Sequence, residues 1–272
     1  MTQDINKLGF KSIAKDYDLF FIDIWGVIHN GLNLYKDAVE VLNSLFEMKK
    51  EFILLTNAPR PNQNVIEFLL KMGLKKEHTS KVYTSGQAAL NYLVKNYKDK
   101  IFYHIGPPRD FGLFKEFKSM KSENIDKAEY FLCTGLFDEF DKDLNYYKKI
   151  LEYKIDKVMI CTNPDLIVDR GNVREYCAGS VAKVFDEIGG KVEYFGKPYP
   201  QVYNLAADTN NKKILCIGDN LNTDITGANI QSFDSLLITN GIHKEEIEKN
   251  NFENILKKYE VKLNFIQSNL KW

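Results

Sequence analysis

The chain has 272 residues, of which 44% are hydrophobic and 27% are charged, a composition typical of a soluble globular protein. Lys and Arg balance Asp and Glu at 37 each, so the chain lacks the basic excess that nucleic-acid binding needs. The polar N-terminus carries no apolar signal segment, and no apolar run is long enough to span a bilayer. We therefore expect a cytoplasmic protein without a nucleic-acid or membrane partner.

Short apolar runs rich in β-branched and aromatic residues recur along the chain, and amphipathic helical patterns separate many of them. The expected strands cover residues 19–24, 52–57, 81–85, 101–106, 130–135, 157–163, 192–196, 213–219 and 235–240. Helices are expected at 37–50, 62–73, 174–189 and 200–209, with Gly73 and Gly189 at helix ends. The pattern of residues 251–272, first helical and then extended, predicts a terminal helix followed by an extended tail.

This alternation predicts an α/β fold with a doubly wound, mostly parallel sheet that helices cover on both faces. Joins between modules are expected near residue 85 and near 185–195, beside glycines. Four cysteines are scattered without a CxxC pair, and three of them lie in or beside strand-like runs. Buried free thiols are therefore favoured over a disulfide framework or a zinc site.

Polar residues end or follow several of the expected strands, at the carboxyl ends where ligands bind in parallel α/β sheets. Asp23 ends the first strand and Gly26 follows it, Thr56 and Asn57 end the second, Lys197 follows the strand at 192–196, and Asp219 and Asp224 follow the apolar run KILCI at 213–217. Taken singly, each is explained as a helix cap or a turn residue. Their combination favours a site, because each passes the same positional test.

These residue types suit phosphoryl transfer. A carboxylate that displaces a group from phosphorus forms an aspartyl phosphate. A lysine and a metal then balance the charge on the phosphoryl oxygens. Convergent carboxylates and backbone oxygens suit Mg²⁺. A glycine such as Gly26 allows a tight turn whose N–H groups face the ligand space.

Four segments, DIWGVIHNG, LLTNAPR, FGKPYP and GDNLNTDITGA, resemble the motifs of the haloacid dehalogenase (HAD) superfamily, in particular its class IIA branch of 4-nitrophenylphosphatase-like enzymes. The resemblance implies a Rossmann-like core from residues 1–85 and 186–272, with a smaller α/β cap at 86–185. It also implies a Mg²⁺-dependent hydrolase of small phosphorylated metabolites that forms an aspartyl phosphate. The phosphoryl acceptor, water or another molecule, and a homodimeric state are left open.

The resemblance also implies a role for each site residue. Asp23 is the nucleophile; Thr56, Asn57, Lys197 and Gly26 bind the phosphoryl group; Asp23, Asp219 and the main-chain oxygen of Trp25 bind Mg²⁺; and Asp224 orients the water shell of the metal. Asn163 and Asp165 of the cap are expected to face the leaving group.

Trp25 departs from the family pattern, which has a second Asp two positions after the nucleophile. An indole donates a hydrogen bond but exchanges no proton near neutral pH. We therefore expect a compromised acid–base step, least harmful for leaving groups that are stable without a proton. His29 is a candidate proton shuttle because histidine titrates near neutrality. The alternatives are that His29 is a solvated turn residue or packs on Trp25.

Trp25 also leaves a second function open, namely a catalytically weak or inactive HAD-fold protein that binds Mg²⁺ and a phosphorylated metabolite in a regulatory role. The complete set of Asp23, Thr56, Lys197 and Asp219 favours the enzyme. Arg60 ends the segment LLTNAPR, three residues after Asn57. It is expected either to contact a substrate anion or to cap the helix that begins near Pro61.

Overall fold

The computed structural model describes residues 2–170 and 173–272, and the contacts within the chain divide it into two compact units. The first unit comprises Met1–Thr56, Ile66–Tyr83 and Lys197–Trp272, and the second comprises Asn57–Val65 and Thr84–Gly196. The second unit thus includes residues 186–196 and the segment after Thr56, both of which the expected boundaries at 85 and 185 assign to the core.

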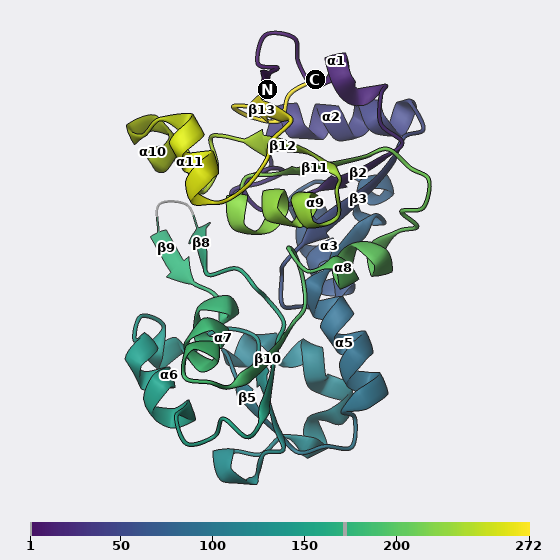
Figure 1. Ribbon diagram of the computed structural model, residues 1–272. Helices are drawn as coiled ribbons and strands as arrows, with labels where there is room; N and C mark the ends of the chain where they lie inside the picture. The colour runs from purple at the N-terminus through teal and green to yellow at the C-terminus, as the bar shows by residue number, and fades with distance from the viewer. Residues whose placement is uncertain (1, 171–172) are drawn as a thin grey trace. The chain divides into compact units, whose positions relative to one another are not determined.

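The sheet of the first unit has the strand order β1-β13-β12-β11-β2-β3-β4 (Figure 1). Its strands are β1 (Gln3–Asp4), β2 (Leu19–Ile22), β3 (Glu51–Thr56), β4 (Val82–Thr84), β11 (Ile214–Gly218), β12 (Asp234–Ile238) and β13 (Phe265–Gln267). Its helices are α1 (Lys11–Ala14), α2 (Lys36–Glu47), α3 (Asn62–Lys71, which begins in the second unit), α4 (Lys76–Thr79), α8 (Pro200–Ala206), the π-helical turn η4 (Leu221–Ile225), α9 (Thr226–Ile230), α10 (Lys244–Lys249) and α11 (Phe252–Lys258).

The central strands of this sheet are buried along their whole length, which explains why they form continuous apolar runs. Leu19 and Phe21 of β2 pack with Val202 and Tyr203 of α8 and with Ala228 of α9. Helix α2 in turn buries one of its faces and contacts β3. The core of the first unit therefore fixes the position of β2 and β11, whose ends carry the candidate site.

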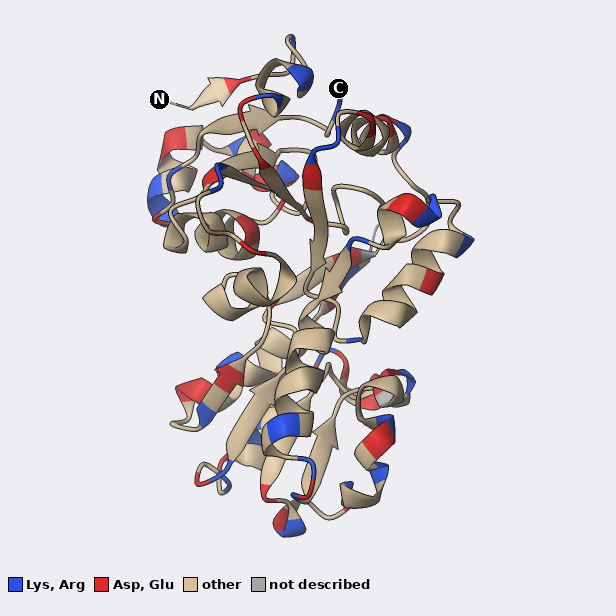
Figure 2. Ribbon diagram, turned by 90° about the vertical axis from the view of Figure 1, so that its right-hand side faces the viewer, with Lys and Arg blue, Asp and Glu red and all other residues tan. Residues whose placement is uncertain are grey.

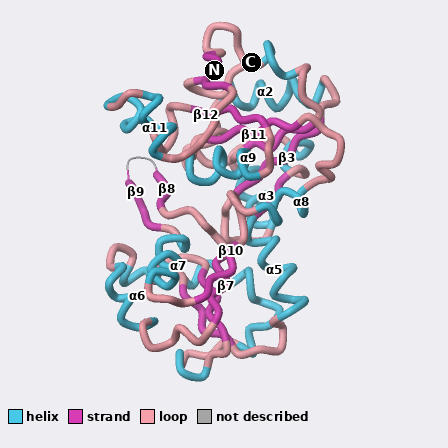
Figure 3. Tube along the Cα trace, in the orientation of Figure 1, coloured by secondary structure: helices cyan, strands magenta, loops and turns pink. Residues whose placement is uncertain are grey.

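The second unit has a parallel sheet in the order β10-β7-β6-β5 and a separate antiparallel hairpin of β8 and β9. Its strands are β5 (Phe102–Ile105), β6 (Tyr130–Cys133), β7 (Val158–Cys161), β8 (Ile167–Arg170), β9 (Val173–Tyr176) and β10 (Lys191–Tyr194). Its helices are α5 (Ser85–Asn96), the 3₁₀ segments η1 (Pro108–Met120), η2 (Ile125–Lys127) and η3 (Asp138–Phe140), α6 (Leu144–Leu151) and α7 (Ala178–Glu187). Figure 3 shows the four-stranded sheet of this unit between α6 and α7 on one side and α5 on the other, and the hairpin of β8 and β9 apart from it.

The predicted α/β class with mostly parallel sheets is confirmed, since every pairing with a recorded register in the two main sheets is parallel. Each expected strand is present, and Gly73 and Gly189 have the positive φ (95° and 94°) of residues that end helices. The four cysteines are free and buried, as expected.

The expectation of one helix over residues 174–189 is wrong at its start, because Val173–Tyr176 form β9 and the helix begins at Ala178. The β-branched Val173 and the pairing with β8 favour the extended conformation here. Helices α5 and α6 were not expected, although Thr84 and Asp143 cap them through backbone N–H groups of the first turn.

Acidic and basic residues are interspersed over the helices and loops of each unit (Figure 2). None of the described helices combines the length and the apolar character that crossing a lipid bilayer requires.

Candidate active site

Polar side chains of the first unit follow β2, β3 and β11, which are neighbours in its sheet. Ile22 of β2 pairs with Leu54 of β3 and with Ile217 of β11, so residues one or two positions further on leave the sheet at the same edge. These residues are Asp23, Thr56 and Asp219, and each is less than a tenth exposed. The parallel register therefore brings three of the predicted site residues to one edge.

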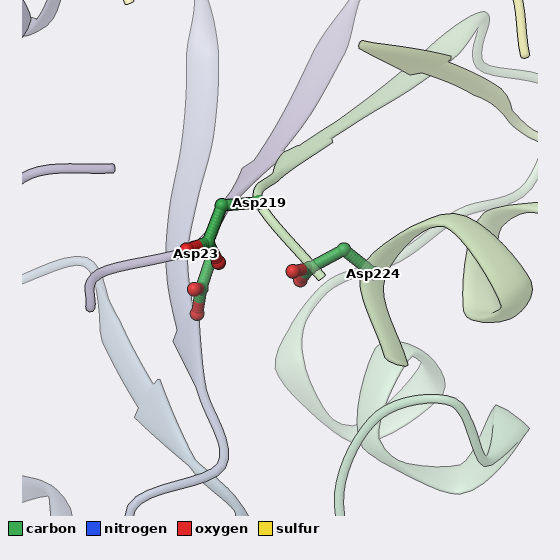
Figure 4. A group of neighbouring side chains, drawn as sticks. All are labelled: Asp23, Asp219 and Asp224. Carbon is green, nitrogen blue, oxygen red and sulfur yellow. The ribbon is translucent and has the colours of Figure 1, made fainter. Parts of the chain in front are cut away.

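A cluster of three carboxylates lies at this edge. Asp23, Asp219 and Asp224 each offer an oxygen within 4.8 Å of the others. Figure 4 shows the carboxylate of Asp224 directed toward those of Asp23 and Asp219. Burial, and then the charges of Asp23 and Asp224, hold the pKa of Asp219 well above its usual range. Buried like charges repel one another, so this cluster is suited to a bound cation.

Lys197 contacts two of the three carboxylates. Its Nζ donates to Asp23 Oδ1 at 2.6 Å and to Asp224 Oδ1 at 2.7 Å, and its side chain is 5% exposed. When all three carboxylates are ionised, the single ammonium leaves an excess of negative charge in a buried site. A divalent cation with a preference for oxygen ligands would balance that excess, so the donor set fits Mg²⁺.

Two glycines and a backbone N–H hold Asp219 in place. A Cβ on Gly26, whose φ is +84°, would lie 2.1 Å from Asp219 Oδ2, and a Cβ on Gly241 would lie 2.2 Å from Asp219 Cβ. The N–H of Ile242 donates to Asp219 Oδ2 at 2.9 Å. Gly241 and Ile242 were not among the predicted site residues, although a glycine just after an expected strand is a signal for a close backbone approach.

The structure shows Gly26 in a role that differs in detail from the expected one. Its N–H donates to the carbonyl oxygen of His29 at 2.8 Å, within the turn that follows Asp23. The contribution of Gly26 in the structure is therefore the close approach to Asp219. The phosphate contact of this residue stays a prediction.

His29 packs inside the same turn. Its ring centroid lies 5.0 Å from that of Trp25 and 5.5 Å from that of Phe68, and it is 2% exposed. Its Nδ1 accepts the N–H of Gly31 at 2.8 Å. Burial lowers the pKa of His29 to about 4, so its ring is neutral at neutral pH. These contacts match the packing alternative, and the proton shuttle stays a prediction.

The three remaining predicted residues contact one another in the second unit. Asn57 Nδ2 donates to Asp165 Oδ1 at 3.1 Å, and the N–H of Asp165 donates to Asn163 Oδ1 at 2.9 Å. Asn57 Oδ1 lies against Gly196, where a Cβ would be 2.5 Å away. This network fixes the amide of Asn57, while its phosphate contact and the contact of Asn163 and Asp165 with a leaving group stay predictions.

The fold and the site define an α/β protein with a carboxylate and lysine cluster at the carboxyl ends of parallel strands. Two family models match the chain: "Haloacid dehalogenase-like hydrolase" over residues 20–120 and a HAD-hydrolase-like model over residues 194–261. The chain belongs to the haloacid dehalogenase superfamily of hydrolases.

Curated relatives cover most of the chain. The 5′-nucleotidase YutF of Bacillus subtilis is 24% identical over 85% of this chain and 91% of its own length, and phosphoglycolate phosphatase 2 of Arabidopsis thaliana is 25% identical over 89% of each. A haloacid dehalogenase-like hydrolase from Brucella suis superposes with a TM-score of 0.83 at 26% identity, over 96% of this chain and 98% of its own. The 4-nitrophenylphosphatase of Thermotoga maritima, at 23% identity and a TM-score of 0.70 over 95% of this chain and 96% of its own, shares the fold.

Proposed function

We propose that this chain is a Mg²⁺-dependent phosphatase of small phosphorylated metabolites and that Asp23 forms an aspartyl phosphate. The observation that carries the proposal is the buried contact of Lys197 Nζ with Asp23 Oδ1 at 2.6 Å inside the carboxylate cluster. The names of the curated relatives, a nucleotidase and several phosphatases, support the hydrolysis of phosphate esters.

In the proposed reaction an oxygen of Asp23 attacks phosphorus, and the bond from phosphorus to the leaving oxygen breaks. Lys197 orients the carboxylate and balances the charge on the phosphoryl oxygens. The hydroxyl of Thr56 donates to one of these oxygens. Water then attacks the phosphorus of the aspartyl phosphate, so that inorganic phosphate leaves and the carboxylate of Asp23 is restored.

Mg²⁺ would be held by Asp23, Asp219 and the main-chain oxygen of Trp25, and Asp224 would orient its water ligands. The bound ion supplies additional positive charge next to the phosphoryl oxygens. Asp219 needs a cation in this place, because burial and two neighbouring carboxylates raise its pKa. The N–H of Ile242 fixes one oxygen of Asp219 and leaves the other for the metal.

Trp25 weakens the proton transfer to the leaving oxygen. The absence of a general acid costs about 10² to 10⁴ in rate. The loss is smallest for leaving groups that are stable as anions, such as nitrophenolate, the carboxylate released from an acyl phosphate or the phosphate released from a phosphoanhydride, and largest for alkyl phosphates. We therefore propose that the chain hydrolyses aryl, acyl or anhydride phosphates faster than sugar phosphates.

A second candidate function is regulatory binding of Mg²⁺ and a phosphorylated metabolite with little turnover, and Trp25 is the observation that favours it. The two functions share the same contacts of Lys197 and Asp219, so only turnover separates them. A cytoplasmic location remains part of the proposal, and the four buried free thiols are in keeping with a reducing compartment.

The decisive experiment measures the release of nitrophenolate from 4-nitrophenyl phosphate against Mg²⁺ concentration. The native chain should show Mg²⁺-dependent release, and Asp23→Asn should lose it by at least about 10²-fold because the nucleophile is gone. Asp208→Asn, at an exposed carboxylate that contacts Asn210, is the matched control. Release that survives Asp23→Asn would refute the enzyme proposal. Vanadate binding with Mg²⁺ but without release would favour the regulatory function.

A further inference from the structure

The backbone of Arg60 is fixed before any ligand binds. Arg60 lies between Pro59 and Pro61, and Pro61 restricts the backbone of Arg60 because Arg60 precedes it. Its carbonyl oxygen accepts the hydroxyl of Thr84 at 2.5 Å. A Cβ on Gly86 would lie 2.2 Å from the backbone nitrogen of Arg60, so only glycine lets helix α5 approach this closely. The residue is therefore held in one place by the second unit.

The side chain of Arg60 is anchored at one end. Its Nε donates to Asp110 Oδ1 at 3.2 Å, and the side chain of Asp110 is 3% exposed, whereas that of Arg60 is 43% exposed. Burial raises the pKa of Asp110, and the contacts with Arg60 and with the Thr134 hydroxyl oppose that rise. Thr134 in turn bonds His104 Nε2 at 2.8 Å. This buried chain of polar groups orients the carboxylate that holds Arg60.

The two terminal nitrogens of Arg60 do not take part in the contact with Asp110. Among the residues that the structure describes, the contacts of the Arg60 guanidinium are made through Nε, to Asp110, and not through Nη1 or Nη2. Arg174 is different, because its Nε and Nη2 both bond the carboxylate of Asp169, at 2.8 and 2.9 Å. Arg60 therefore keeps its outer N–H groups available on a partly exposed side chain, while its inner N–H is tied to a buried carboxylate.

We propose that the second unit binds a carboxylate or phosphate group at Arg60, and that the natural substrate is a phosphorylated metabolite with such a second anionic group. A guanidinium matches both groups through paired N–H donors. A side chain that is already fixed loses little freedom on binding, which strengthens the contact. The substrate assignment rests on the proposed function.

The chain itself limits how far Arg60 lies from Thr56, a residue that binds the phosphoryl group in the proposed function. Arg60 follows Thr56 by four residues, so their Cα atoms are at most about 14 Å apart. A metabolite of a few carbon atoms, with a phosphate at one end and an acid group at the other, meets this limit.

The test compares 4-nitrophenyl phosphate with 3-carboxy-4-nitrophenyl phosphate, which share a good leaving group and differ in one carboxylate. The native chain should have the higher kcat/KM on the carboxylated compound. Arg60→Gln should lower the ratio of the two kcat/KM values by about 10- to 100-fold, the worth of a charged hydrogen-bond pair. Asp110→Asn should lower this ratio less than Arg60→Gln does. Arg60→Lys should give a ratio between those of Arg60→Gln and the native chain.

Arg109→Gln is the matched control, because it removes an exposed arginine paired with the exposed Asp138. It should leave the ratio unchanged. A ratio that Arg60→Gln does not change, or that Arg109→Gln lowers equally, would overturn the proposal. A purely structural role of Arg60 would lower the melting temperature without changing the ratio.

Calorimetry with benzylphosphonate and 4-carboxybenzylphosphonate measures the preference for the additional carboxylate as a difference in affinity, without turnover. A compound with a second phosphonate in place of the carboxylate shows which anionic group Arg60 prefers. If the native chain releases no nitrophenolate but binds the carboxylated phosphonate more tightly, and Arg60→Gln removes this preference, the phosphatase proposal fails and the anion site stands. Equal affinity for all three compounds would overturn the anion site.

Discussion

Replacing Trp25 with Asp tests whether the missing general acid limits the reaction. The turn that carries residue 25 is held by main-chain bonds, from the N–H of Gly26 to His29 and from the N–H of Ile28 to Ile24, each at 2.8 Å. A new side chain therefore leaves the position of Asp23 and the main-chain oxygen of residue 25 unchanged. The substitution adds a carboxylic acid where the family pattern has one and removes an indole.

The substitution should change two quantities, the stability of the chain and the rate of the reaction. The indole is half-buried against the His29 ring and Gly31, so its loss costs about 2 kcal/mol, less than the value for a fully buried Trp. A domain with ordinary stability survives this loss. In rate, a general acid is worth about 10² to 10⁴, and this gain applies only where the leaving oxygen needs a proton.

The assay compares kcat/KM on glycerol 3-phosphate with kcat/KM on 4-nitrophenyl phosphate. Trp25→Asp should raise the first by at least about 10²-fold and the second by much less. Trp25→Asn is the control, because it removes the indole and matches Asp in shape but donates no proton to the leaving group. An equal gain on both substrates, or the same gain from Trp25→Asn, would show that the indole blocks the site sterically and would refute the proton argument.

Three further predictions concern charge, packing and pH. Lys197→Met leaves the carboxylate cluster without a positive charge, so the free energy of unfolding, measured in urea with EDTA, should fall by about 3 to 5 kcal/mol. An unchanged urea midpoint would contradict a stabilising role of the Lys197 ion pairs. Gly241→Ala displaces Asp219 and should weaken Mg²⁺ binding in calorimetry at least about tenfold, whereas Gly112→Ala, which meets ordinary contacts, should not. Burial and then Lys121 lower the pKa of His104 to about 3, so below pH 6.5 the unfolded chain binds a proton that the folded chain does not. The free energy of unfolding is therefore unaffected by this group above pH 6.5 and falls by up to about 4 kcal/mol toward pH 3. His104→Gln should make the urea midpoint depend less on pH between pH 7 and 4.

The sequence predicted the strands well because each buried parallel strand is a compact apolar run. Leu19–Ile22 and Ile214–Gly218 are buried at every position, so no other element competes for them. Helix α5 was missed because its small residues give a weak apolar stripe, and Ser85, Gly86, Ala88 and Ala89 become buried only through tertiary contacts. Strand β9 was missed because its alternation covers four residues that are mostly exposed.

The candidate site was predictable where one residue type at a strand end carries the chemistry. Asp23, Lys197 and Asp219 were found in this way, because a parallel register brings strand ends together wherever they lie in the sequence. The backbone support was not predictable. Gly241 and Ile242 contact Asp219 only because β11 and β12 are neighbours in the sheet, and a strand order is not encoded in any local pattern.

The segment LLTNAPR shows a different limit of prediction from sequence, because Thr56 and Asn57 are consecutive but belong to different compact units. Thr56 ends a strand of the first unit, whereas the amide of Asn57 is bonded to Asp165 in the second. One peptide bond joins them, so any rearrangement around Asp165 reaches the strand end through the chain itself. On the proposals made above, substitutions in the second unit should alter substrate preference through Asn57 and Arg60, while the carboxylates and Lys197 keep their own contacts within the first unit.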